Sequence, residues 1–317
     1  MIHARVVAGG IQEVLPPPSP AISTMTLVKQ TQEGPVEITL PGPVDVFCDT
    51  SVWRSLSPVD LKKLQSLKSR HGLRYRFSIV SFVELISHFE DQPFARVKSW
   101  FSRINQLCEP EILPSPEWEF LNSVGLIHYI DRAWIPDTRG IATLLKVLSR
   151  ACSLTDVPKG LLNIGHYRKL REIDETSFQK SIEGLRDFIG QGPVKHEDSE
   201  KIITWFAGTL ANFFLLIRPS GGKISYRQLE EEEKRRFRYA FTSGPGLLFF
   251  AHCTAVVKDS VRPQKKVDLN HLYDSLQLLL VSGSRLFVTK DNLYFSYPTL
   301  DPQVQRVISL DDLLAGV

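Results

Sequence analysis

Two short apolar runs near the start of the chain have the pattern of buried parallel strands. The run 44–48 is followed at once by an acid, Asp49, and the run 77–80 leads into a helix that begins near Ser81. Between the runs, the segment 57–60 (Ser-Pro-Val-Asp) combines a serine cap, a first-turn proline and a capping-box acid, so a helix is expected to start there. Because parallel strands require crossover connections, the order strand, helix, strand, helix predicts a parallel sheet covered by helices.

The long middle section is largely helical in pattern, and the end of the chain returns to alternation. Apolar residues recur at spacings of three and four over 141–148, and the glutamates 230–232 precede the basic residues 234–236 by four positions, the favourable order on a helix. The last fifty residues predict a helix at about 269–281, a strand at 285–289, an edge strand at about 304–308 and a short helix at 311–314.

The α/β core is therefore expected to be split in sequence by a helical insertion. Residues 1–43, rich in Pro, Thr and Gly, predict a tail or loose hairpin with a strand-like segment at 36–40. Residues 44–89 and 267–317 form the expected discontinuous catalytic core, and residues 90–266 form the insertion. The predicted fold class is α/β, a three-layer α/β/α arrangement around a central parallel sheet.

Composition limits the classes of protein to which the chain can belong. Its 317 residues, 43% of them hydrophobic, can fill a large core without disulfides. The four cysteines are far apart in the sequence, which excludes a zinc ribbon and predicts reduced thiols. The N-terminal segment lacks the pattern of a secretory signal, and a cytoplasmic protein is expected. The uncharged run 202–217 is shorter than the roughly 20 residues of a membrane span, so a buried helix is favoured. A net charge of +3 means that any basic surface must be local.

Four acids stand where an α/β sheet places its ligands. Asp49 and Asp291 directly follow predicted strands, Glu84 lies one short turn beyond another, and Asp274 is on the 269–281 helix among leucines, where an isolated charge would be costly. Since the carboxyl ends of parallel strands share one edge, the four are expected to converge. Crowded carboxylates repel one another in a low dielectric, which favours a bound hard divalent cation. Asp274 is expected to have the most apolar setting of the four acids. The fold is expected to be destabilised near neutral pH when the cation is absent.

The segments around these acids carry a family resemblance. Cys-Asp-Thr-Ser-Val at 48–52, Ser-Phe-Val-Glu-Leu at 81–85, Leu-Tyr-Asp at 272–274 and Val-Thr-Lys-Asp at 288–291 resemble, in order and context, the four signatures of PIN-domain nucleases. The resemblance covers about 44–89 and 268–314. The section between the second and third segments is far longer than in compact members of that family.

The resemblance implies a site, a cofactor and a substrate. Asp49, Glu84, Asp274 and Asp291 would coordinate Mg²⁺ or Mn²⁺ and activate water against an RNA phosphodiester, with Thr50, Ser51 and Thr289 as polar supports. A DNA target, the number of ions, an inhibitory protein partner and a homodimer stay open.

Further charged residues near these segments have two interpretations each. Asp268 either caps the 269–281 helix or adds an acid to the metal site. His88 lies one turn from Glu84, and His271 lies one turn from Asp274. Packing or solvent exposure is favoured for both histidines over a role in supporting the metal ligands. The basic segment formed by Lys258, Arg262, Lys265 and Lys266 is a solvated linker or a weak phosphate-binding site.

Two other classes of function compete with a nuclease. A haloacid-dehalogenase-like phosphatase would need a second Asp two residues after Asp49, where Ser51 stands. A catalytically silent PIN-like scaffold, which would bind RNA or a protein through the insertion, stays open, although all four acids are present.

Overall fold

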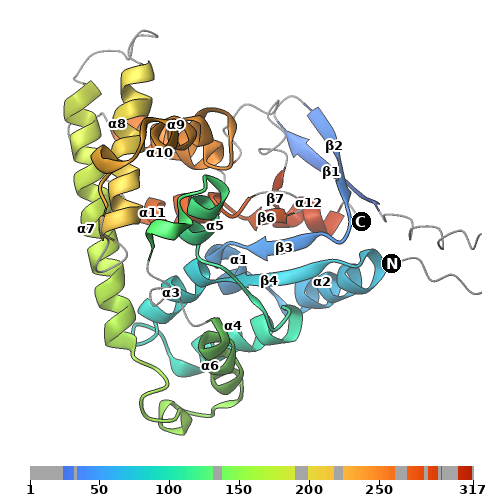
Figure 1. The fold of residues 1–317 in the computed structure, drawn as a ribbon. Helices are drawn as coiled ribbons and strands as arrows, with labels where there is room; N and C mark the ends of the chain where they lie inside the picture. The colour runs from blue at the N-terminus through green and yellow to red at the C-terminus, as the bar shows by residue number, and fades with distance from the viewer. Residues whose placement is uncertain are drawn as a thin grey trace, which may run out of the picture.

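A five-stranded parallel sheet lies at the centre of the molecule (Figure 1). The computed structural model describes residues 24–31, 34–130, 138–189, 199–217, 224–260, 270–281, 285–291, 294 and 306–315. The strand order is β5-β4-β3-β6-β7, formed by β3 (Asp45–Cys48), β4 (Arg74–Ser78), β5 (Ile112–Leu113), β6 (Arg285–Thr289) and β7 (Val307–Ser309). Helices flank the sheet, and the predicted three-layer α/β/α class is confirmed.

The register of the central strands brings their carboxyl ends level. Asp45 pairs with Arg74 of β4 and with Arg285 of β6, and Cys48 pairs with Val288. The residues 46–48 of β3 are all buried, as expected for a strand covered on both faces. The residues directly after β3 and β6 therefore emerge at one edge of the sheet.

Helix α2 (Pro58–His71) is defined by local sequence signals at both ends. The Ser57 side chain accepts a hydrogen bond from Asp60 N at 3.1 Å, and the Asp60 carboxylate accepts from Ser57 N at 3.3 Å, completing the predicted capping box. Gly72 ends the helix with a φ of 64°, in the left-handed region that favours glycine.

The second apolar run is divided between two elements. β4 ends at Ser78, and α3 (Ile79–Ser87) begins at the next residue because Ser81 N donates to the Ser78 side chain at 3.1 Å. The predicted strand over 77–80 was thus wrong for its last two residues. Apolar periodicity alone could not locate this boundary, since a short continuous apolar run is compatible with a strand or with a buried helix.

A hairpin precedes the central strand. β1 (Thr24–Thr31) and β2 (Gly34–Pro41) pair antiparallel, and the predicted strand-like segment 36–40 lies within β2. Alternate residues are buried on one face, and Gln30 N donates to the side chain of Asp312 at 3.4 Å. The hairpin packs in this way against α12 (Leu310–Ala315).

The section 90–266 supplies mostly helices and one strand of the sheet. Its helices are α4 (Phe94–Leu107), α5 (Pro116–Ser123), α6 (Thr138–Arg150), α7 (Ile164–Ile189), α8 (Ser199–Asn212), α9 (Glu231–Ser243) and α10 (Leu247–Ser260), with short 3-10 turns at 127–129, 154–156 and 226–228. β5 pairs in parallel with β4 through Phe77 and Ile112. The sheet therefore takes an edge strand from the segment that the sequence assigns to the insertion.

The uncharged run 202–217 forms the end of α8 and a π-helix (Phe213–Ile217). Ala207, Ala211 and Phe214 are fully buried, as predicted for a core helix. Within the described ranges, the helices are all too short or too polar to cross a membrane.

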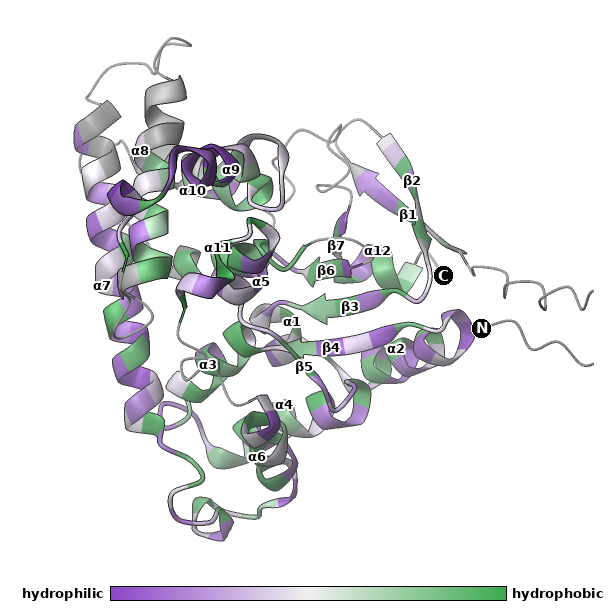
Figure 2. Cartoon of the chain, in the orientation of Figure 1, coloured by the Kyte–Doolittle hydropathy of each residue, from purple (hydrophilic) through white to green (hydrophobic). Residues whose placement is uncertain are grey.

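The charges of α9 pair differently from the expected spacing. Glu231 bonds to Lys234 at 2.7 Å and Glu232 to Arg235 at 2.8 Å, three positions apart rather than four. Glu230 is the cap residue of α9, and its backbone N–H donates to Glu233 Oε2 at 2.9 Å. Figure 2 shows α9 as strongly hydrophilic, in keeping with a solvated face.

Substitution of Ser57 by Ala tests the cap of α2. The free energy of unfolding is expected to fall by about 1 kcal/mol, because Asp60 N loses its acceptor. Urea denaturation measures the change. Ser69→Ala is the matched control on the same helix, since Ser69 only donates to Gln65 O on the exposed surface, and should stay within about 0.5 kcal/mol of the parent. Equal losses in both variants would contradict the cap.

Candidate active site

The four predicted acids come from four elements around the carboxyl edge of the sheet. Asp49 caps α1 (Thr50–Ser55) after β3, Glu84 lies in α3 after β4, Asp274 lies in α11 (Asn270–Leu278), and Asp291 follows β6. In Figure 1, β3 and β6 both point toward the side of the molecule where α11 and α7 lie.

Asp49 is held by donors from three segments of the chain. It is only 4% exposed. Its Oδ1 accepts hydrogen bonds from Thr50 N at 2.6 Å and from Gln277 Nε2 at 3.1 Å. Its Oδ2 accepts from Thr289 Oγ1 at 3.3 Å and from the Ser51 hydroxyl. Four donors to one carboxylate fix its position and orientation.

Glu84 is a nearly buried carboxyl group, 7% exposed, beside Asp49. Thr50 Oγ1 donates to its Oε2 at 2.5 Å, so Thr50 contacts both acids. Burial, followed by the charges of Asp49 and Asp274, raises the pKa of Glu84 to about 8, although Thr50 and Arg54 act in the opposite direction. Without a cation, Glu84 therefore holds a proton at neutral pH.

Tyr294 is a buried tyrosine whose pKa is affected by all four acids. Its ring is fully buried, 5.2 Å from the ring centres of His252 and Phe287, and its hydroxyl has no hydrogen-bond partner among the described residues. Burial raises the pKa of this phenol well above its usual value. The charges of the four acids add to that shift, in the order Asp274, Asp49, Glu84 and Asp291. No pattern in the sequence pointed to this tyrosine.

Asp274 and Asp291 are half-buried, in contrast to Asp49 and Glu84. The expectation that Asp274 has the most apolar setting was therefore wrong. Its neighbours Leu272 and Leu276 are two positions away, which places them on the opposite side of α11. Asp291 is linked to Asp49 through Thr289, whose Oγ1 accepts from Asp291 N at 3.0 Å.

Two polar residues that sequence reasoning missed complete the surroundings of Asp49. Gln277 is fully buried, and besides its bond to Asp49 its Oε1 lies 3.4 Å from Ser81 Oγ. Ser81 Oγ also lies 3.2 Å from Cys48 O. The signal was available for Gln277: it stands three positions after Asp274, on the same side of the helix, between two buried leucines.

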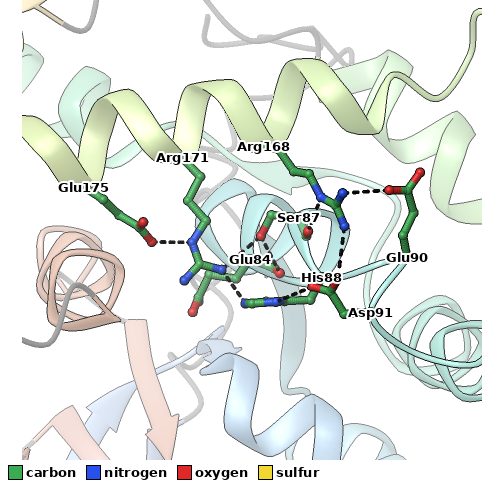
Figure 3. Close-up of polar contacts among 8 residues, drawn as sticks. All are labelled: Glu84, Ser87, His88, Glu90, Asp91, Arg168, Arg171 and Glu175. Carbon is green, nitrogen blue, oxygen red and sulfur yellow. Dashed lines mark hydrogen bonds and ion pairs between the residues drawn. The ribbon is translucent and has the colours of Figure 1, made fainter.

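The long helix α7 is fastened to the end of α3 by two arginines (Figure 3). Arg168 Nε donates to Ser87 O at 3.0 Å, and its other nitrogens pair with Glu90 at 2.7 Å and Asp91 at 3.2 Å. Arg171 donates to Ser87 Oγ at 3.1 Å. Cationic donors suit the carboxyl end of a helix, so α7 stabilises the helix that carries Glu84.

His88 takes part in this attachment. Its ring contacts Asp91 at 3.2 Å and Arg171 (Figure 3), and burial is the main cause that lowers its pKa. The packing interpretation of His88 is thus the one that its contacts support.

Other candidates lie outside what the structure describes. Asp268, Arg262, Lys265 and Lys266 fall outside the described residues, and His271 and Lys258 lie in helices whose side chains there are not described.

The chemical type of the four side chains suits a hard divalent cation. Carboxylate oxygens are the ligands that Mg²⁺ and Mn²⁺ prefer, and Asp49 and Glu84 present theirs on either side of Thr50. Within the described ranges, no three Asp, Glu, His or Cys side chains are close enough to enclose an ion. Thr50 instead links the carboxylates of Asp49 and Glu84, and Thr289 links the carboxylate of Asp49 to the backbone N–H of Asp291.

Comparison of the chain with models of protein families, with curated proteins and with solved structures gives no match. The function must therefore be argued from these residues and their geometry.

The raised pKa of Glu84 predicts how stability depends on pH in the presence of a chelator. The folded state binds this proton up to about pH 8, whereas the unfolded chain releases it near 4.5. The free energy of unfolding should therefore fall as the pH rises from about 4.5 to about 8, by on the order of a few kcal/mol. Glu84→Gln, which cannot ionise, should lose this contribution to the slope.

Chemical denaturation at several pH values measures these slopes. The control is Glu172→Gln, at an exposed position of α7, which should keep the slope of the parent. Saturating Mg²⁺ should flatten the slope of the parent, because a cation favours the ionised carboxylate. Identical slopes for the parent and Glu84→Gln would refute the assigned role of this proton.

Proposed function

We propose that this chain is a PIN-like, metal-dependent ribonuclease that hydrolyses phosphodiester bonds. One observation carries the proposal: at the carboxyl edge of a parallel sheet, Thr50 joins the carboxylates of Asp49 and Glu84, and Thr289 joins Asp49 to the backbone of Asp291. Open α/β sheets bind ligands at this edge.

Asp49, Glu84, Asp274 and Asp291 are the residues that would hold Mg²⁺ or Mn²⁺. When bound, the cation supplies positive charge that offsets the carboxylates, lowers the pKa of water and neutralises charge that develops on the phosphate. The raised pKa of Glu84 supports a cation there, because two neighbouring acids oppose its ionisation and a cation would relieve that opposition.

The side chains around the acids perform the positioning. Thr50, Ser51, Gln277 and Thr289 orient the carboxylate of Asp49 from three segments. Thr50 Oγ1 donates to Glu84 Oε2, so Thr50 orients the carboxyl group of Glu84 as well as that of Asp49. Preorganised acids of this kind limit the reorganisation that the reaction requires.

Substitution of Asp49 by Asn tests the reaction. Cleavage of a single-stranded RNA in Mg²⁺ or Mn²⁺ is expected to fall by more than about 100-fold, since even residues that only orient a metal ligand contribute about 10–100-fold. The fold should persist by circular dichroism, because the amide keeps the size of the side chain.

The matched control is Asp45→Asn, at the opposite end of the same strand, where the carboxylate pairs with Arg74 at 2.8 Å. It should retain cleavage. Undiminished cleavage by Asp49→Asn would overturn the mechanism. Tight binding of RNA that no divalent cation converts to cleavage would favour the scaffold function, in which the helical section binds RNA or a protein without turnover.

A further inference from the structure

Helices α1 and α4 carry basic residues and no acids. Their 20 residues include Arg54, Arg96, Lys98 and Arg103, against a net charge of only +3 for the whole chain. The apolar residues of α4 at 97, 100, 101, 104 and 107 are buried, so the cations lie on its outer side. The two helices pack against each other and join these charges into one surface.

Two of the arginines share one aromatic ring. The guanidinium carbon of Arg54 lies 5.8 Å from the ring centre of Trp100, and that of Arg96 lies 6.0 Å from it. Trp100 is 3% exposed, whereas both arginines are exposed. Arg103 extends the group, because its Nη1 lies 3.5 Å from Trp53 O in α1. We call Arg54, Arg96, Arg103 and Trp100 the α1–α4 basic surface.

The cations of this surface lack counter-ions on the described part of the chain. None of Arg54, Arg96 and Arg103 forms an ion pair there, whereas Arg168, Arg171 and Arg285 each pair with an acid. Glu90 and Asp91, the acids that follow α3, are bonded to Arg168. Like charges gathered without partners favour the binding of an external anion.

The surface adjoins the acid cluster. α1 begins directly after Asp49 and packs against α3, the helix that carries Glu84. A polyanion that contacts Arg96 and Arg54 would therefore continue toward Asp49 and Glu84. The aromatic ring between the arginines holds their planar groups in place without neutralising them.

We infer that the α1–α4 basic surface binds the phosphate backbone of a single-stranded RNA and leads it to the acids. The inference rests on the proposed function for the identity of the substrate. Arginine presents paired donors that match phosphate oxygens, and proteins that bind single strands track the backbone with a positively charged surface. Phosphate contacts do not distinguish ribose from deoxyribose.

The experiment compares the parent with the double variant Arg54→Gln, Arg96→Gln. Binding of a labelled oligouridylate of about 12 nucleotides is followed by fluorescence anisotropy in EDTA, so that no cleavage occurs. Loss of two phosphate contacts should reduce the slope of log affinity against log salt by about 1.4 and weaken binding about 25-fold at about 0.1 M salt. A single-stranded DNA of equal length should lose affinity by the same factor.

Matched variants distinguish phosphate contacts by Arg54 and Arg96 from a general effect of the net charge on RNA binding. Arg70→Gln, Arg235→Gln makes the same change of charge at exposed positions on α2 and α9, and should alter the slope little. Arg54→Lys, Arg96→Lys should keep most of the affinity, because the charge remains. In Mg²⁺, the glutamine variant should raise KM far more than it lowers kcat.

Unchanged affinity and slope in the glutamine variant, equal losses in the Arg70 and Arg235 variant, or unequal losses for RNA and DNA would each overturn the inference. If the double variant does not fold, Arg96→Gln alone decides, since the side chain of Arg96 is exposed and contacts Trp100 and Gln92. This variant should weaken binding about 5-fold. RNA that binds through this surface but is never cleaved would leave the inference standing and refute the proposed ribonuclease.

Discussion

The buried carboxylate of Asp49 is the constraint on which the rest of the structure depends. It follows the central strand and accepts hydrogen bonds from the start of α1, from Gln277 of α11 and from Thr289 of β6. The last two donors are separated from it by more than half of the chain. A buried carboxylate without donors would be strongly destabilising, so the early and late segments of the core must assemble together to satisfy it.

The distribution of charge depends on that constraint. Acids gather at the carboxyl edge of the sheet, and burial leaves Glu84 protonated at neutral pH rather than allowing every acid to ionise. Two groups of arginines lie near these acids. Arg168 and Arg171 connect α7 to α3. The arginines of α1 and α4 have no acidic partner in the described ranges. One set stabilises the fold, and the other is available to a ligand.

Local signals determined how much of this could be predicted from the sequence. The capped helix α2 and the strand β6 were predicted well, because serine, proline and glycine mark helix ends and a run bounded by polar residues marks a strand. Asp49 and Asp291 were singled out because they come directly after predicted strands, and Asp274 because it lies among leucines on a predicted helix. β5 has only two residues, which is too short for any periodicity, and its place depends on pairing with β4. Tyr294 and the half-exposure of Asp274 arise from tertiary packing, which no short pattern encodes.

The origin of β5 limits how the protein can be divided. Because Ile112 and Leu113 cover the side of β4 away from β3, a shortened chain that joined only 44–89 to 267–317 would expose the backbone amides and carbonyls of β4. Such an open edge offers pairing sites to another molecule. The shortened chain would also lose the arginine donor to Ser87 O at the end of α3. The isolated core would therefore self-associate as its concentration increases. The helical section prevents this by supplying β5, which occupies the edge of β4.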